Sequence, residues 1–111
     1  MISASIKSVR KVDTTKAMAR INAKFLESAS VILQGAARRN TPVDTGRLRS
    51  SISRDVQKDE ATVGTNVNYA QFVEYGTKRM KAQPFMRPAV DKNRKNLIKL
   101  YRDIYRQVFS G

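Results

Sequence analysis

The last quarter of the chain has the most regular alternation of apolar and charged residues in the sequence. From Met86 to Val108, apolar residues recur at steps of three and four, the spacing of one side of an α-helix. On a wheel of 100° per residue they lie within roughly 60° of Leu97. They are Met86, Val90, Leu100, Tyr101, Ile104 and Val108. A long helix with one apolar side must bury it, so the rest of the chain has to supply a second layer.

The opposite side of this helix carries five cations, which lie within roughly 40° of the opposite pole of the wheel. They are Lys92, Lys95, Lys99, Arg102 and Arg106. At 1.5 Å per residue the row is about 20 Å long. Solvated helix faces normally mix both signs, and here only Asp103 is nearby. A solvated face, a contact with an acidic protein and a contact with nucleic acid all remain open.

The net charge of +13 is concentrated at the two ends of the chain. Residues 1–39 carry +6, residues 40–77 carry −1 and residues 78–111 carry +8. We therefore expect an anionic partner to meet the terminal segments and not the middle.

Several classes of function are excluded by composition. The sequence has no cysteine and no histidine, so disulfides, thiol nucleophiles, zinc fingers and Ser-His-Asp triads are ruled out. No apolar run reaches the length of about 18 residues that a membrane span needs. The N-terminal residues lack the continuous apolar stretch of a secretory signal. We expect a protein of a cytoplasm-like compartment that is not an enzyme and has no cofactor.

A second helix is predicted from Thr14 to Asn40. Its apolar residues also recur at steps of three and four, and they are Met18, Ile21, Phe25, Ala29, Ile32 and Ala36. Asp13 or Thr14 can cap its start, and Thr41-Pro42 ends it because the residue before proline avoids helical backbone angles.

The middle of the chain predicts a β-hairpin and a short helix. Residues 48–56 and 61–69 alternate with the period of two that half-buried strands show, and residues 57–60 form the turn. Asn68 caps and Gly76 ends two helical turns. Pro88 suits the first turn of the last helix, where a missing N–H costs nothing.

These elements predict one α+β domain over residues 1–111. A two-stranded hairpin is marginal alone, so the two long helices must cover it or further strands must extend it. Residues 1–12, basic and rich in small side chains, are expected to form an arm that is flexible or ordered by a partner.

Asp44-Thr45-Gly46 matches the tripeptide of aspartic proteases, in which two such loops bring two carboxylates together. In those enzymes the tripeptide ends an apolar strand, whereas here Pro42 precedes it and Arg47 follows it. An ordered turn is the favoured interpretation, with Pro42 fixing its φ, Asp44 bonding backbone and Gly46 taking a positive φ.

Glu74 is the one acid between Ala61 and Val90. We expect it to form an ion pair with Lys78, Arg79 or Arg87, since a general acid working alone is improbable. The neighbouring aromatic residues Phe72, Tyr75 and Phe85 fit core or interface positions better than base stacking.

Three segments, in this order and at these separations, resemble a family of small tail proteins of long-tailed bacteriophages and prophages, known as head–tail joining, neck or tail-completion proteins. The segments are residues 41–52 (TPVDTGRLRSSI), 69–77 (YAQFVEYGT) and 82–89 (AQPFMRPA). The helices before and after them match as well.

The resemblance implies a structural virion protein of the tail or neck, assembled in the host cytoplasm. It would complete the tail or join it to the head connector as a six-fold ring around the DNA channel. Its partners would be copies of itself, the connector, and the tail tube or tail terminator, with DNA close by and no membrane. The five cations of the last helix are a candidate interface on the strength of their charge pattern, because the heavy positive charge is not part of the family's pattern.

By analogy with that family, the three segments would form structural turns. Gly76 would need a backbone conformation closed to other residues, and Phe85 would pack inward. The turn residues are Pro42, Asp44, Thr45, Gly46, Glu74, Tyr75, Gly76, Thr77, Pro84, Phe85, Arg87 and Pro88. The alternative function is a basic nucleic-acid-binding module of a mobile element, although no aromatic RNA-binding signature accompanies the charge.

Overall fold

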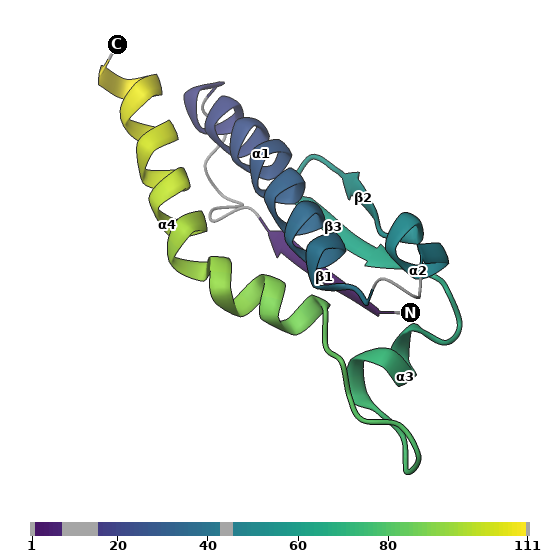
Figure 1. Cartoon of the computed structure of the whole chain (residues 1–111). Coiled ribbons are helices and arrows are strands. Elements are labelled where there is room, and N and C mark those ends of the chain that lie inside the picture. The colour runs from purple at the N-terminus through teal and green to yellow at the C-terminus, as the bar shows by residue number, and fades with distance from the viewer. Residues whose placement is uncertain (1, 8–15, 43–45, 111) are drawn as a thin grey trace.

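Two long helices, α1 (Lys16–Asn40) and α4 (Met86–Ser110), pack against each other and against a three-stranded sheet. In the computed structural model, which describes residues 2–7, 16–42 and 46–110, α1 lies across the sheet and α4 runs beside α1 (Figure 1). The molecule is elongated, at 54 × 21 × 21 Å. The remaining elements are β1 (Ile2–Lys7), α2 (Gly46–Ser51), β2 (Ser53–Val56), β3 (Glu60–Thr65) and α3 (Ala70–Tyr75).

The sheet is antiparallel, in the order β1-β3-β2. Ile2 of β1 lies opposite Thr65 of β3, and Val56 of β2 lies opposite Ala61 of β3. Because side chains alternate along each strand, Ala61 and Val63 face the buried side. The opposite face is polar, and there the Ser5 and Thr62 hydroxyls lie 3.3 Å apart in solvent. The sheet therefore has one covered face and one open face.

Strand β1 corrects the expected N-terminal arm. Residues 2–7 form the third strand of the sheet, whereas residues 1 and 8–12 of that segment lie outside the described residues. Ile2 is buried and Ala4 and Ile6 are half-buried, so three alternate side chains add to the covered face. This strand supplies the extension that the hairpin needs.

Helix α2 corrects the first half of the predicted hairpin. Residues 48–51 are helical and only residues 53–56 pair with β3, which itself ends at Thr65. Leu48 and Ile52 are both fully buried, and their spacing of four residues fits one helical side as well as one strand face. Gly46 begins this helix and does not have the expected positive φ, because the one positive-φ glycine of the described residues is Gly76.

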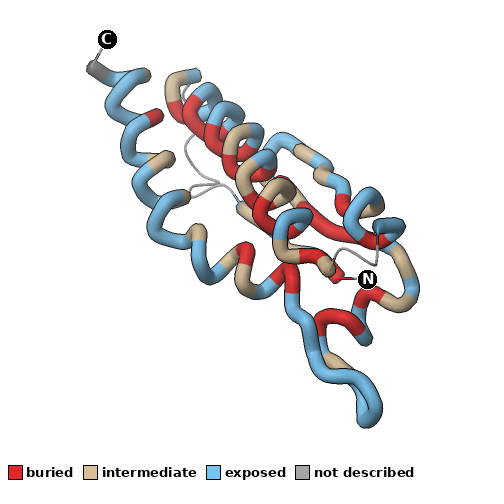
Figure 2. Tube along the Cα trace, viewed as in Figure 1, coloured by how far each residue is buried: buried red, intermediate tan, exposed pale blue. Residues whose placement is uncertain are grey.

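The two long helices match the predicted pattern, and the fold is α+β. The buried side chains form two clusters. The first, which we call the lower cluster, joins α1, β1, α2, β3, α3 and the start of α4, and the second, the upper cluster, joins α1 to the second half of α4. In the upper cluster the Phe25 and Tyr101 rings meet edge to face, with centroids 5.2 Å apart. Figure 2 shows buried residues along α1 and at the start of α4, whereas the second half of α4 is mostly exposed. The predicted caps Asp13 and Thr14 lie outside the described residues.

Candidate assembly surface

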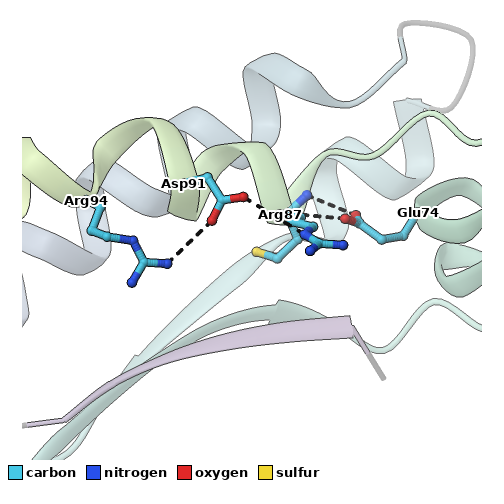
Figure 3. Close-up of polar contacts among 5 residues, drawn as sticks. Glu74, Arg87, Asp91 and Arg94 are labelled. Carbon is cyan, nitrogen blue, oxygen red and sulfur yellow. Dashed lines mark hydrogen bonds and ion pairs between the residues drawn. The ribbon is translucent and has the colours of Figure 1, made fainter.

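The side chain of Glu74, at the end of α3, caps the start of α4. Glu74 is 5% exposed, and its Oε1 accepts hydrogen bonds from the backbone N–H groups of Phe85 at 3.0 Å and Met86 at 2.9 Å. Its Oε2 accepts from the N–H of Arg87 at 3.0 Å (Figure 3). The first N–H groups of a helix have no partner within the helix, and the helix dipole favours a negative charge there. One carboxylate thus connects the second of the three segments named in the sequence analysis, residues 69–77, to the third, residues 82–89. We call these three segments motifs.

The prediction that Glu74 forms an ion pair is wrong. Its carboxylate forms no ion pair with any of the three cations considered for it, all of which lie in the described part of the chain. Arg87 instead lies 3.9 Å from Asp91, which also pairs with Arg94 at 3.4 Å (Figure 3). The reason is geometric, because the three backbone donors occupy both oxygens of a buried carboxylate.

Gly76 ends α3 with φ 77° and ψ 176°, a backbone conformation that is nearly exclusive to glycine. A Cβ at this position would lie 2.8 Å from the Ala82 nitrogen and 2.9 Å from the Met80 oxygen. Thr77 closes the turn: its N–H donates to the Met80 carbonyl at 2.8 Å, and its hydroxyl accepts from the Met80 N–H at 3.0 Å. The tight turn brings residues 82–87 back beside α3, within reach of the Glu74 carboxylate. Asn68 does not cap α3, whose cap position is Tyr69 with no side-chain bond.

The third motif anchors α4 in the core. Phe85 is fully buried, and its carbonyl accepts a bond of 3.3 Å from the Asn40 side chain at the end of α1. Pro88 lies in the first turn of α4, where proline is tolerated, and Pro84 is exposed just before it. Tyr75, by contrast, is 72% exposed. The motif thus connects α4 to α1 as well as to α3.

The first motif follows α1, and two of its predicted turn residues, Asp44 and Thr45, lie outside the described residues. The hypotheses placed on them, a backbone-bonding turn and a protease carboxylate, therefore stay predictions. Its described part is tied to α1: the Thr41 hydroxyl donates to the Ala37 carbonyl at 2.7 Å, and Arg49 donates to the Arg38 carbonyl at 2.9 Å. Pro42 is half-buried.

The five cations predicted on the last helix all lie exposed on one side of α4, and we call them the cationic stripe. Three apolar side chains beside it were missed by the sequence pattern: Ile98, Tyr105 and Phe109 are exposed. The sequence does contain a signal for these three residues, because on the helix wheel of α4 they fall between the core-facing side and the cationic side. The surface is therefore mixed, with an apolar part and a charged part.

Metal and membrane sites find no support in the described residues. No group of three or more acidic residues there could hold a metal ion. Among the described helices, none is both long and apolar enough to span a bilayer.

The comparisons with known proteins point to one family. The family model described as "Bacteriophage HK97-gp10, putative tail-component" matches residues 3–76, two thirds of the chain. The match runs from β1 to Gly76, so it includes the first two motifs and leaves out the third motif and α4. Searches of curated proteins and of solved structures found no match.

Proposed function

The chain belongs to the HK97-gp10-like family of bacteriophage tail components, and we propose that it completes the phage tail or joins the tail to the head connector, as a ring subunit around the DNA channel. The family makes it a structural tail protein associated with the virion. The observation that carries the proposal is the family match over residues 3–76.

The turn geometry is suited to a subunit that must keep its shape in an assembly. Glu74 and Phe85, which are buried, and Gly76, which has a positive φ, hold α3, the turn and α4 in one arrangement. A subunit with preorganised contact surfaces loses less conformational entropy on assembly than a flexible one. In this proposal the three motifs maintain the shape of the subunit, and the contact residues lie elsewhere.

The charge of the chain indicates which neighbours a ring would have. Each copy carries +13, so a homo-oligomer gathers positive charge that opposes its own closure. The ring is therefore stabilised by anionic neighbours, which in this place are an acidic surface of the connector or tail and the DNA in the channel. The cationic stripe is exposed on the surface of α4.

The experiment is deletion of the gene from the phage or prophage that carries it, followed by addition of the purified protein to the defective extract. We expect DNA-filled heads and unjoined or unfinished tails in the deletion, and infectious particles after addition. Electron microscopy should place the protein at the head-proximal end of the tail, and quantitative mass spectrometry of particles should give its copy number. Normal infectious particles from the deletion would refute the proposal.

A second candidate function, duplex DNA binding, is favoured by the exposed cationic stripe alone. DNA binding through several phosphates weakens steeply with salt, because log K falls by about 0.9 per phosphate neutralised for each tenfold rise in salt. Tight duplex binding with such a slope, in a chain absent from purified particles, would favour this second function.

A further inference from the structure

The second half of α4 exposes three large apolar side chains in a line. Ile98 is 56% exposed, Tyr105 45% and Phe109 53%. Their spacings of seven and four residues place them within about 40° on the helix wheel. The Tyr105 and Phe109 rings are in contact, with centroids 4.7 Å apart. We call these three residues the apolar stripe.

The apolar stripe borders a shallow groove with a cationic rim. The groove has a volume of about 490 Å³, and its lining residues are Ile98, Tyr101, Arg102, Tyr105 and Arg106. Arg102 and Arg106 belong to the cationic stripe, so the two stripes adjoin along the helix. Tyr101 supports the groove from behind, since its ring packs on Phe25 of α1. The surface therefore has an apolar centre and a positive border, and Tyr101 at its base packs on α1.

The combination of the two stripes selects one kind of occupant. From Lys92 to the end of the chain, Asp103 is the single acid, so a second copy that presented this face would bring like charges together. Duplex DNA would pair with the cations, but its phosphate backbone has no apolar surface to cover Ile98 or Phe109. A protein with apolar side chains flanked by Asp and Glu satisfies both parts, and its approach is accelerated by the positive field.

We propose that the apolar stripe and the adjoining cations of α4 dock an acidic segment of a different virion protein, whose apolar residues cover Ile98, Tyr105 and Phe109. This assignment rests on the proposed function and specifies the chemistry of one of its partners. Contacts between copies in the ring then use surfaces other than this side of α4.

The test places a photo-crosslinking residue, benzoylphenylalanine, at Phe109 and, as a matched control, at Val31. Val31 is 49% exposed on α1 and is apolar, so it reports contacts that exposure alone would give. Each variant is expressed from the phage genome during assembly, and crosslinked partners are identified by mass spectrometry. Detection of the chain in purified particles tests the proposed function, and the partner found from position 109 tests the docking surface.

We expect position 109 to crosslink to another virion protein, within a segment of net negative charge, and position 31 not to. Adding Ile98→Gln and Tyr105→Gln to the variant with the crosslinker at position 109 should lower its crosslinking yield about tenfold or more. Adding Arg102→Glu should lower that yield as well. Circular dichroism and melting temperature should stay unchanged, since these side chains are exposed. Crosslinks to a second copy or to DNA, equal yields at both positions, or a yield that Ile98→Gln and Tyr105→Gln leave unchanged would each overturn the assignment.

Discussion

At the scale of single residues, Glu74 has the most consequential position. Its carboxylate is buried and accepts three backbone N–H bonds from a segment that begins eleven residues later. A buried donor left without an acceptor costs about 1–3 kcal/mol, and a charged acceptor strengthens the bonds that it makes. The residue therefore contributes to stability through backbone groups, and no cationic side chain is involved.

We predict that Glu74→Gln lowers the free energy of unfolding by about 1–3 kcal/mol, because the neutral amide keeps one acceptor oxygen and turns a donor toward the remaining N–H group. Urea unfolding measures the change. The control is Glu27→Gln, whose exposed carboxylate pairs with Arg54 at 2.8 Å and whose loss should cost at most about 1 kcal/mol. Equal stability of the two variants would show that the three bonds do not stabilise the start of α4.

Gly76→Ala is expected to destabilise the protein by about 1–3 kcal/mol, since its φ and ψ lie in a region that other residues avoid. The added Cβ would also meet the backbone of Met80 and Ala82. Thermal unfolding measures the effect. Gly46→Ala is the control, because a Cβ there has no atom within 4 Å. An unchanged melting temperature for Gly76→Ala would contradict the conformation described for this turn.

The importance of these residues was predictable from the sequence, but the role of Glu74 was not. The end of α3 at Gly76 was inferred from a local pattern, whereas its unusual backbone was expected by analogy with the tail-protein family, and the structure confirms it. The capping role of Glu74 was missed because its donors lie eleven to thirteen residues away, and only the folded turn brings them together. A local sequence pattern does not reveal a contact between residues so far apart in the chain. The sequence therefore favoured the nearest cations as partners of Glu74.

At the scale of elements, the long helices were predictable and the short ones were not. The apolar period of α1 and α4 persists over 25 residues in each helix, which leaves little ambiguity. Leu48 and Ile52 are four residues apart, a spacing that fits both a helix and a strand. Helix α2 has only six residues, too few for the sequence pattern to distinguish the two. Strand β1 had a weak signal in the alternation of Ile2, Ala4 and Ile6, because two of its outward residues are only serines.

The attachment of β1 depends on a close approach at Gly64. A Cβ at this position would lie 2.6 Å from the Ser3 Cβ and 2.7 Å from the Ile2 carbonyl oxygen. We predict that Gly64→Ala separates β1 from β3 while α1 and α4 stay packed. Hydrogen exchange should then increase in residues 2–7, with little change in α1.

The companion variant Ser3→Gly removes the shortest of the three close contacts, the one to the Ser3 Cβ, so Gly64→Ala combined with Ser3→Gly should recover part of the protection of β1. Slow exchange of residues 2–7 in the single Gly64→Ala variant would contradict the close approach.

At the scale of the whole molecule, the placement of charge matters more than its total. We predict that Lys95→Glu, Lys99→Glu and Arg102→Glu together leave the monomer folded and reduce its incorporation into particles about tenfold or more. The reason is that these residues are exposed and lie in the cationic stripe. Incorporation is measured by complementation of a deletion extract.

The matched control reverses three exposed cations of α1 instead, with Lys16→Glu, Arg20→Glu and Lys24→Glu. Both triple variants have the same net charge, so only position distinguishes them. An equal loss of incorporation in the two would attribute the effect to net charge, and normal incorporation of the α4 variant would make the stripe a solvated face.

The Glu74 carboxylate also lies at a boundary within the chain. The family match ends at Gly76, and α4 begins ten residues later, yet the group that holds the first turn of α4 belongs to the matched part. A change at Glu74, inside the matched residues, would therefore loosen the first turn of a helix that lies outside them.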